Sequence, residues 1–377
     1  MSTTIASSMP DTPTDTPTTM RAVVKESAAP GLTYVENHPV PCGSTGVPMQ
    51  PGPGEVLVRV AMAGVCGTDR HIHEWDAWAS ERVRVGVVTG HELYGHIERI
   101  GPGVSGLEVG QRVSAEGHIV GPKGNQGHGT DFNARTGNPH IAREMEIIGI
   151  DRDGCFAEWI IIPAYNIWPV HDEIPDRWAP IFDPLGNAVH TVMEAQVSAK
   201  SVLITGVGAI GLMSVMVARA AGAASIFAVD IDESRLSLAS ELGADECFSA
   251  TDASWVERVR EATRGEGADA LLEMSGHPSA FENGFSALRN GGVASLLGTP
   301  SEPFEFDIAR HVIFKAATVK GIHGRRMFET WYQMENLLLS GRIDLDRVIT
   351  HTLALEQIND AIAAMQTGEA IKPILTI

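Results

Sequence analysis

The sequence predicts an α/β protein with two domains, one rich in β-strands and one containing a doubly wound parallel sheet. Up to about residue 169, short segments of alternating apolar residues are separated by turns, which is typical of strands. From about residue 183, strand-like and helical segments alternate, which is typical of parallel strands joined by crossover helices. A length of 377 residues also favours two domains over one.

The first half contains four strand-like segments, and the first of them carries valines at every second position. The segments are EVLVRVAMAGVC (55–66), ELYGHIERIGPGV (92–104), VGQRVSAEG (109–117) and GCFAEWIIIP (154–163). The segment PCGSTGVPMQPGPG (41–54) is rich in Gly and Pro and is expected to form a long loop.

The second half alternates between strand-like and helical segments. The strand-like ones are SVLITG (201–206), SIFAVD (225–230), ADALLEMSG (268–276), GGVASLLGT (291–299) and ATVKGIHG (317–324), and helical patterns include 209–223 and 233–244. From about residue 323 a further helical segment, 327–341, and strand-like ends are expected to return to the first domain.

Composition and charge exclude several classes of partner. A net charge of −19 argues against nucleic acid and anionic membranes, because polyphosphate binding needs a basic face. No apolar run approaches the roughly 18 residues needed to span a bilayer. Residues 1–19 lack the features of a secretion signal and are expected to form a disordered tail. Cys42, Cys66, Cys155 and Cys247 show no disulfide spacing, so a reduced, cytoplasmic setting is expected.

The segment GVGAIG predicts a dinucleotide site. It places Gly206, Gly208 and Gly211 between a strand and a helix, and the next strand ends in Asp230, 19 residues past Gly211. Asp230 would accept hydrogen bonds from the adenosine ribose and repel a 2′-phosphate, which favours NAD. Arg235 could instead face a phosphate or the adenine ring. The alternative is an ordinary strand–helix turn without a ligand.

A second group of residues offers metal ligands. Cys66, His91 and Glu92 supply a thiolate, an imidazole and a carboxylate, which is a ligand set suited to zinc. By spacing alone the signal is weak, because a lone Cys is often a buried apolar residue and His-Glu pairs occur by chance.

The whole arrangement resembles the zinc-dependent medium-chain dehydrogenases, and within them the L-threonine 3-dehydrogenase branch most closely. The resemblance runs from about Met20 to Ile377. The segments that carry it are CGTDRHIHEWDAWA, GHELYGHIERIGPGV, EGHIV, FAEWIIIPAYNIW, FDPLGNAVHT, LEMSG and GRRMFETWY. It implies a GroES-like catalytic domain over 20–182, a Rossmann NAD-binding domain over 183–322, and a return to the catalytic domain over 323–377.

The resemblance also implies roles for individual residues. Cys66, His91 and Glu92 would hold one catalytic zinc, with Asp183, or more weakly Glu158, as a displaceable ligand, and Asp183 could alternatively assist proton movement. Thr68 and His71 match a proton relay, although they could be a turn residue and a surface histidine. His118 would lie near the substrate, and Arg325 near a cofactor phosphate or substrate carboxylate. Further residues would line the cofactor, or would instead only pack at the edge of the sheet: Ile210, Leu297, Gly298, Thr299, Ile322 and His323.

The segment 119–140 departs from the family pattern. Relatives place four cysteines around a structural zinc there, whereas this chain has Gly121, Gly124, Gly127 and Arg135. We therefore expect no structural zinc and one zinc ion per chain. Binding of a metal by His118, His128 and His140 is the alternative, but no regular spacing supports it.

These observations predict NAD- and zinc-dependent oxidation of a secondary alcohol, with L-threonine, giving 2-amino-3-oxobutanoate, as the expected substrate. The missing cysteines, the 41–54 loop and Arg70 beside the relay leave room for a polyol or sugar dehydrogenase of the same family. A non-catalytic nucleotide-binding protein is a third interpretation, disfavoured because Cys66, His91 and Glu92 are all present. Family analogy suggests a homo-oligomer, a tetramer or a dimer.

Overall fold

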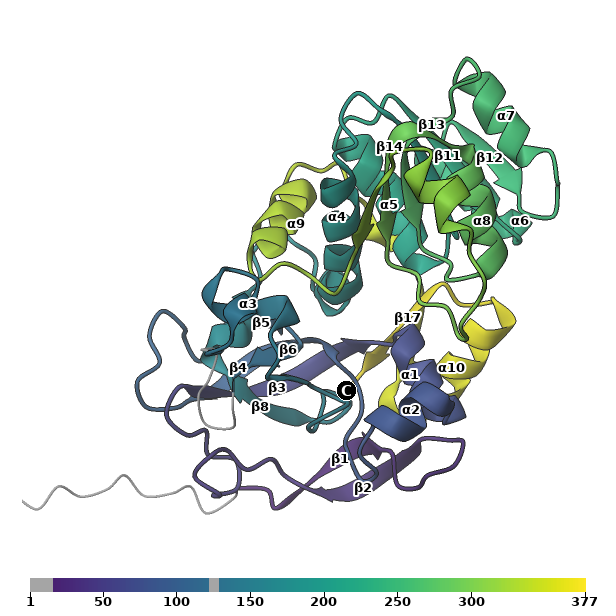
Figure 1. Ribbon diagram of the computed structural model, residues 1–377. Coiled ribbons are helices and arrows are strands. Elements are labelled where there is room, and N and C mark those ends of the chain that lie inside the picture. The colour runs from purple at the N-terminus through teal and green to yellow at the C-terminus, as the bar shows by residue number, and fades with distance from the viewer. Residues whose placement is uncertain (1–15, 122–128) are drawn as a thin grey trace, which may run out of the picture.

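The computed structural model describes residues 16–121 and 129–377 and contains two large β-sheets (Figure 1). One hydrophobic core is shared by residues of both sheets, and a second lies within the first domain. One sheet is parallel and lies among most of the helices. The other is largely antiparallel and contains the first half of the chain together with its C-terminal strands. The predicted α/β fold class, a GroES-like part joined to a Rossmann part, is confirmed.

The parallel sheet has six strands in the order β12-β11-β10-β13-β14-β15. In chain order they are β10 (Ser201–Thr205), β11 (Ser225–Asp230), β12 (Glu246–Ser249), β13 (Ala268–Glu273), β14 (Leu288–Leu296) and β15 (Thr318–Gly321). The order changes direction at β10, so the loops after β10 and β13 diverge at the carboxyl edge of the sheet, the position where such sheets bind ligands.

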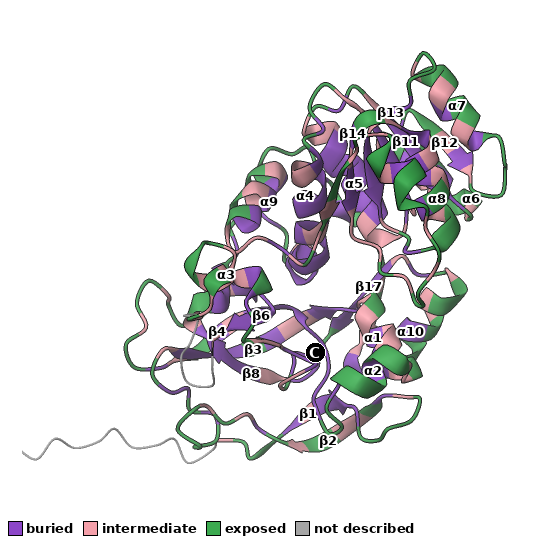
Figure 2. Cartoon of the chain, in the orientation of Figure 1, coloured by how far each residue is buried: buried purple, intermediate pink, exposed green. Residues whose placement is uncertain are grey.

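Helices cover both faces of this sheet: α4 (Phe182–Ala195), α5 (Ala209–Ala220), α6 (Glu233–Glu241), α7 (Trp255–Ala262), α8 (Pro278–Ala287) and α9 (Glu329–Leu339). Successive side chains of a strand point to opposite faces. Accordingly, Val202 and Ile204 of β10 pack in one core with α4 and α5, whereas Leu203 packs in another with α7 and α8. Figure 2 shows α4 almost wholly buried in this arrangement.

The second sheet has seven strands, with β16-β17-β3-β4-β5-β9 in order and β8 paired to β3. They are β3 (Glu55–Gly64), β4 (Glu92–Ile100), β5 (Arg112–Ala115), β8 (Trp159–Pro163), β9 (Ile167–Pro169), β16 (Ile349–Ala354) and β17 (Lys372–Thr376). The antiparallel register of β3 and β4 sets Glu92 opposite Gly64, and β17 pairs with the same end of β3. Three distant segments therefore meet at this point.

Shorter elements complete the domain. Two-stranded sheets pair β1 (Thr19–Val24) with β2 (Thr33–Pro39), and β6 (His118–Val120) with β7 (Met145–Ile147). The helices are α1 (Gly67–Glu74), α2 (Ala77–Arg82), α3 (Phe132–Arg135) and α10 (Ile358–Thr367), and single turns lie at 139–141, 164–166, 176–181, 309–313, 345–347 and 355–357. Helices α1, α2 and α10 lie together beside β17 (Figure 1).

The two ends of the chain can be compared with what the sequence predicts. Of the expected tail, residues 1–15 lie outside the described residues, and Thr19 already pairs with Pro39 in β1. Of the segment 323–377, β16 and β17 join the seven-stranded sheet, whereas α9 packs against α4. Within the described ranges no helix is both long and apolar enough to cross a membrane.

Candidate active site

Cys66, His91 and Glu92 are brought together by the pairing of β3 with β4. Cys66 follows the end of β3 and is the N-cap of α1, while His91 and Glu92 stand at the start of β4. Opposite Glu92 is Gly64, where a Cβ atom would collide with the Glu92 carboxylate. Glycine at this position therefore allows the carboxylate to lie against the backbone of β3.

The geometry and chemistry of these three residues fit a zinc ion. Their ligand atoms all lie within 4.8 Å of one another, and within residues 16–121 and 129–377 no other such group exists. His91 and Glu92 are buried and Cys66 is half-buried. Among the described residues, Nδ1 of His91 and Oδ1 of Asp69 are buried without a hydrogen-bond partner. Buried polar atoms of this kind are rare unless a ligand or ion satisfies them.

The electrostatics of the site also favour a cation. Burial disfavours the charged imidazolium of His91, but a hydrogen bond to Cys66 and the charges of Cys66, Asp69 and Asp183 raise the pKa of His91 to about 10. The neighbouring acidic side chains thus stabilise a proton on His91. A divalent cation would supply the same compensation and displace that proton, because metal-bound histidine is deprotonated.

Lys372 is part of this site and was not predicted from the sequence. Its ammonium lies 2.6 and 2.7 Å from the two oxygens of Glu92 and donates to the carbonyl of Val65 at 2.8 Å. Burial opposes the charge of Lys372, but the attraction of Glu92 and Cys66 raises its pKa. Burial raises the pKa of Glu92, and the Lys372 cation opposes that shift and orients the carboxylate. A single Lys in the strand KPILT has no local pattern that marks it as functional.

Asp183 lies near the three ligands but is bound by another residue. It stands in the first turn of α4, and its Oδ1 is 2.6 Å from Nη1 of Arg325. Its charge contributes to the raised pKa of His91, which places it in the same electrostatic environment. Its carboxylate does not belong to the group formed by Cys66, His91 and Glu92.

Arg325 is buried in a group of charged side chains beside Asp183. Its side chain is 3% exposed and lies between the carboxylates of Glu116 and Asp183. Its Nε and Nη2 donate to Glu116 at 2.9 and 2.6 Å, and Nη1 donates to Asn187 at 3.1 Å. The physical reason is that a buried guanidinium needs counter-charges, and these use most of its donors.

Glu116 is the centre of a buried network that links Arg325 to His118. It is fully buried and, besides Arg325, accepts from Trp331 Nε1 at 2.9 Å and from the His118 backbone at 3.0 Å. Burial opposes its charge, but Arg325 and His118 hold the pKa of Glu116 well below its ordinary value. His118 also stacks on His323, with ring centroids 5.4 Å apart. This network of side chains thus connects β6, the segment after β15, and α9.

Thr68 and His71 lie on α1, three residues apart and therefore on one face of the helix. Oγ1 of Thr68 is 3.7 Å from Sγ of Cys66, which places this hydroxyl beside the metal ligands. Nδ1 of His71 is 2.6 Å from Oδ2 of Asp76. Sequence reasoning did not single out Asp76, although it falls in the segment DRHIHEWDAWA.

Glu158 is placed apart from the metal ligands. Its oxygens accept from the backbone N–H of Arg21 at 2.8 Å and from Nη2 of Arg21 at 3.0 Å, and its backbone carbonyl accepts from Val60. It therefore links β1 to the start of β8, and it does not join the group around Cys66.

The glycine-rich turn lies between β10 and α5, as the motif predicts. Gly206 has φ +85°, and Gly208 is the N-cap of α5. A Cβ atom on Gly211 would collide with the carbonyl of Gly206, so the helix approaches the turn closely because Gly211 lacks a side chain, whereas a Cβ atom on Gly206 would collide with Ser275. Ile210 lies in the first turn of α5. The N-terminus of α5 thus points its free N–H groups toward a position suited to a pyrophosphate.

Asp230 ends β11 and fixes the turn. Its Oδ2 accepts from the backbone of Val207 at 2.7 Å, and its Oδ1 accepts from Asp232 at 3.0 Å. Arg235 lies in α6 at 3.6 Å from Asp232. The other expected cofactor residues follow strands at the same carboxyl edge: Leu297, Gly298 and Thr299 after β14, and Ile322 and His323 after β15. Backbone N–H groups of Leu297 and Gly298 donate to the carbonyl of Glu273.

Among the described residues, His118 and His140 do not belong to a metal-ligand group. His118 stacks on His323, whereas His140 is buried against His190 at 5.6 Å. Burial and the neighbouring charges of His190 and Arg326 lower the pKa of His140 to about 4. His128, Gly124 and Gly127 lie outside the described residues.

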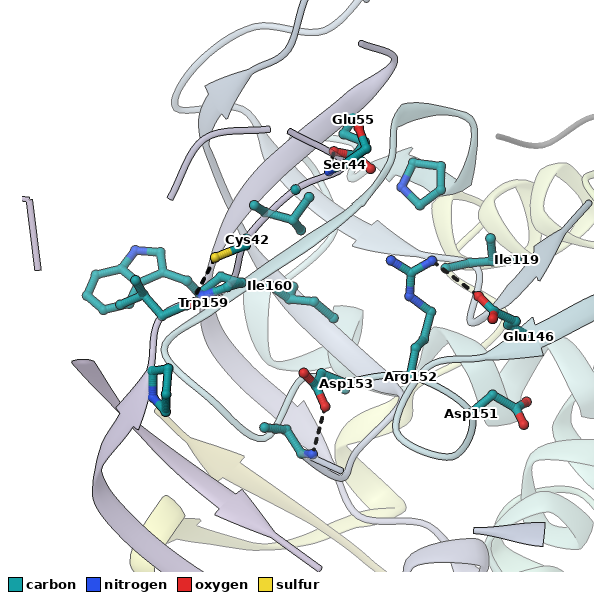
Figure 3. A pocket seen from close by; sticks show the side chains of 18 of the residues that line it. Cys42, Ser44, Glu55, Ile119, Glu146, Asp151, Arg152, Asp153, Trp159 and Ile160 are labelled. Atoms are coloured by element: carbon teal, nitrogen blue, oxygen red, sulfur yellow. Dashed lines mark hydrogen bonds and ion pairs between the residues drawn. The ribbon is translucent and has the colours of Figure 1, made fainter. Parts of the chain in front are cut away.

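A pocket of about 540 Å³ opens elsewhere in the first domain, and its lining residues include none of the candidate metal ligands, relay residues or cofactor residues. Figure 3 shows its labelled side chains, among them Cys42, Glu55, Arg152 and Trp159, which come from the 41–54 loop, β3, the turn before β8, and β8. Its cations are paired, Arg152 with Glu146 at 3.6 Å and Arg84 with Asp153 at 3.3 Å. We place the chemistry at Cys66, His91 and Glu92 because, in the described part of the chain, potential metal-ligand atoms converge at no other place.

Comparison with known proteins agrees with this geometry. Residues 52–172 match the alcohol dehydrogenase GroES-like domain, and residues 209–340 match the zinc-binding dehydrogenase domain. The chain is 45% identical to L-threonine 3-dehydrogenase of Symbiobacterium thermophilum, over 95% of this chain and 97% of the relative. It is 42% identical to L-threonine 3-dehydrogenase of Bacillus subtilis, over 94% of this chain and 98% of the relative.

Among solved structures, the chain is similar to an alcohol dehydrogenase of Escherichia coli in complex with NADH. The two share a TM-score of 0.84 and 25% identity over 96% of this chain and 100% of the other. Both halves of the chain match family domains. Relatives that are 42% and 45% identical also match nearly its full length. The chain belongs to the zinc-binding alcohol dehydrogenases of the medium-chain dehydrogenase family.

Proposed function

We propose that this protein is an NAD-dependent, zinc-dependent L-threonine 3-dehydrogenase that oxidises L-threonine to 2-amino-3-oxobutanoate. The observation that carries the proposal is the convergence of Cys66, His91 and Glu92 within 4.8 Å, in a chain 40–45% identical to relatives of that name. Oxidation of a secondary alcohol removes a hydride from carbon and a proton from oxygen, so the site must provide for both.

Cys66, His91 and Glu92 would hold the zinc ion, and Asp183 remains close enough to respond to its charge. When bound, the zinc supplies a Lewis acid that lowers the pKa of an alcohol, and the nicotinamide supplies the hydride acceptor. Lys372 pairs with Glu92 and opposes its protonation, and Asp183 is paired with Arg325, so three protein ligands would leave a position for a substrate oxygen.

The chain's own residues then carry the proton. Thr68, at 3.7 Å from the sulfur of Cys66, is placed to accept the hydroxyl proton and pass it along α1 to His71. His71 is 40% exposed, so it can release the proton to water. His118, held by Glu116, would contact the substrate from the side of β6.

For the dinucleotide we propose NAD over NADP. Asp230 ends β11, and Asp232 and Glu233 follow it within three residues. A 2′-phosphate on the adenosine ribose would meet this group of carboxylates, whose only neighbouring cation on α6, Arg235, is already near Asp232. Repulsion by these charges disfavours NADP.

We also propose that the protein is a homo-oligomer, a dimer or a tetramer. Strand β15 is an edge strand of the parallel sheet, and exposed apolar side chains lie on and before it: Ile308, Ile313, Phe314 and Val319. Phe314 is 80% exposed. Unpaired strand edges flanked by exposed apolar groups are typical of surfaces that a second chain covers.

A substrate panel tests the proposed reaction. We expect NADH formation with L-threonine, and much slower formation with polyols, sugars and simple secondary alcohols. Cys66→Ala should lower the rate at least about a thousandfold, because a metal site that loses its thiolate loses its Lewis acid. Turnover of a polyol or sugar with no turnover of L-threonine would assign the protein to another substrate class. An active Cys66→Ala variant would show that the metal site is not the catalytic one.

A further inference from the structure

The contact between His71 and Asp76 spans the corner between α1 and α2. Helix α1 ends at Trp75, whose φ is +56° and whose N–H donates to the carbonyl of His71 at 3.0 Å. The chain turns at this point and brings Asp76 back against the last turn of α1. Nδ1 of His71 then lies 2.6 Å from Oδ2 of Asp76, a distance typical of a charge-assisted hydrogen bond.

Asp76 is fixed from its other side. It is the N-cap of α2, and its Oδ1 accepts from the backbone N–H of Ala79 at 2.9 Å. Slight burial opposes its charge, but the bonds to Ala79 and His71 lower the pKa of Asp76. The carboxylate is thus ionised and oriented by the helix, and one oxygen remains for the imidazole.

Other charged groups near His71 are already paired. On α1, Arg70 lies 3.6 Å from Glu74, and Glu74 also accepts from Gln366 of α10 at 2.8 Å. From α2, the ring of Trp78 meets the imidazole edge-on at 6.2 Å. In the part of the chain that the structure describes, Asp76 is the acid paired with His71.

The chemical consequence concerns which ring nitrogen carries the proton. An anionic acceptor at Nδ1 fixes the proton on that nitrogen, so Nε2 of the neutral ring is an acceptor. His71 lies on the same face of α1 as Thr68, which is beside Cys66.

We propose that Asp76 is a positioning residue of the proton relay, which holds His71 with Nδ1 protonated and Nε2 free to receive the substrate's hydroxyl proton. The proposal rests on the proposed function, because it assigns the relay to alcohol oxidation. The proton moves from the hydroxyl through Thr68 to Nε2 of His71 and then to water. Asp76 itself neither gains nor loses a proton.

The test separates this role from the capping role of Asp76. Asp76→Asn and Asp76→Ser both keep a side chain that can cap α2, but neither offers an anionic partner to His71. We expect both variants to lower kcat for L-threonine oxidation by about tenfold, a fraction of what a general base contributes, with KM changed less than about twofold. Glu74→Gln, which removes a neighbouring charge without touching His71, is the matched control and should keep the parent kcat.

A double-mutant cycle with His71→Asn shows whether Asp76 acts through the imidazole. In the His71→Asn background, Asp76→Asn should lower kcat no further. Equal loss in both backgrounds, or an unchanged kcat of Asp76→Asn, would overturn the proposal.

The nitrogen-15 NMR spectrum of histidine-labelled protein gives a readout independent of turnover. The His71 signal should report Nδ1–H in the parent protein, and the Nε2–H form should become populated in Asp76→Asn. An Nε2–H signal in the parent would contradict the proposal even in a fully active enzyme. If the spectra show Nδ1–H in the parent and Nε2–H in Asp76→Asn, but the protein oxidises no alcohol, the proposed function is wrong. The effect of Asp76 on the protonation of His71 would still be established.

Discussion

Buried charges dominate this site at the scale of single residues. Arg325, Glu116 and Asp183 form one network, and Lys372 with Glu92 forms a second, all beside the predicted metal ligands. The sequence predicts a cation at position 325 but not its partners, because Glu116 is 209 residues away and no local pattern connects them. Lys372 was missed for the same reason, since it reaches Glu92 through the pairing of β17 with β3.

Arg325→Met tests how strongly the network depends on this guanidinium. The substitution leaves Glu116 buried without its cation, which should lower the free energy of unfolding by roughly 3–5 kcal/mol. Combining it with Glu116→Gln should cost less than the sum of the single changes, because the two residues share one interaction. Chemical denaturation measures these differences. Arg347→Met, at an exposed ion pair with Glu241, is the control and should change stability by less than about 1 kcal/mol.

The same network has a defined pH dependence. The pKa of Glu116 is lowered well below its unfolded value of 4.5, so its contribution to stability is fully present above that value. That contribution is lost as the pH falls below 4.5 toward the folded pKa. The stability difference between the parent and Glu116→Gln should therefore shrink on acidification below about pH 4.5. A difference that stays constant from pH 6 to pH 3 would show that the Glu116 charge does not stabilise the fold.

At the scale of elements, strongly patterned segments were predicted well and short polar ones were not. The alternating segment 55–66 contains β3, and SVLITG contains β10. Helix α1 was not predicted, because it buries only Ile72 and Asp69 and so carries little periodicity. Helix α4 includes Pro184 and Gly186, which disfavour helices. Pro184 falls in the first turn, and a Cβ on Gly186 would press against the side chain of Arg325, so both residues suit their positions.

The segment that replaces the cysteine-bearing lobe of relatives is ordered by other means where it is described. Oδ1 of Asp131 caps α3 by accepting from Asn133 and Ala134, and its Oδ2 accepts from Arg143 at 3.2 Å. A carboxylate thus connects the start of α3 to the backbone at Arg143. No metal-ligand group is found here among residues 118–121 and 129–147.

Metal analysis tests this interpretation of the segment. Because the lobe has no cysteines, we expect one equivalent of zinc per chain by elemental analysis of the purified protein. Cys66→Ala should remove that equivalent, since the remaining two ligands bind zinc weakly. Two equivalents in the parent, or one retained in Cys66→Ala, would reveal a second metal site.

At the scale of the whole molecule, the parallel sheet carries the proposed cofactor site and the seven-stranded sheet carries the proposed metal site. The parallel sheet brings its glycine-rich turn, Asp230 and the ends of β14 and β15 to one edge. The seven-stranded sheet brings Cys66, His91 and Glu92 together through β3 and β4, and residues after β15 contact His118 of β6. This division was predictable because strand–helix alternation and metal-ligand motifs are local in sequence. The contacts that unite the halves were not predictable, because they join residues far apart in the chain.

The rate of NADH formation from NAD and L-threonine, measured before and after removal of bound metal by a chelator, tests the proposed zinc-dependent oxidation most directly. We predict turnover by the protein as purified, loss of turnover in the metal-free protein, and recovery when zinc alone is added back. Undiminished oxidation of L-threonine by protein shown to be free of metal would contradict this proposal.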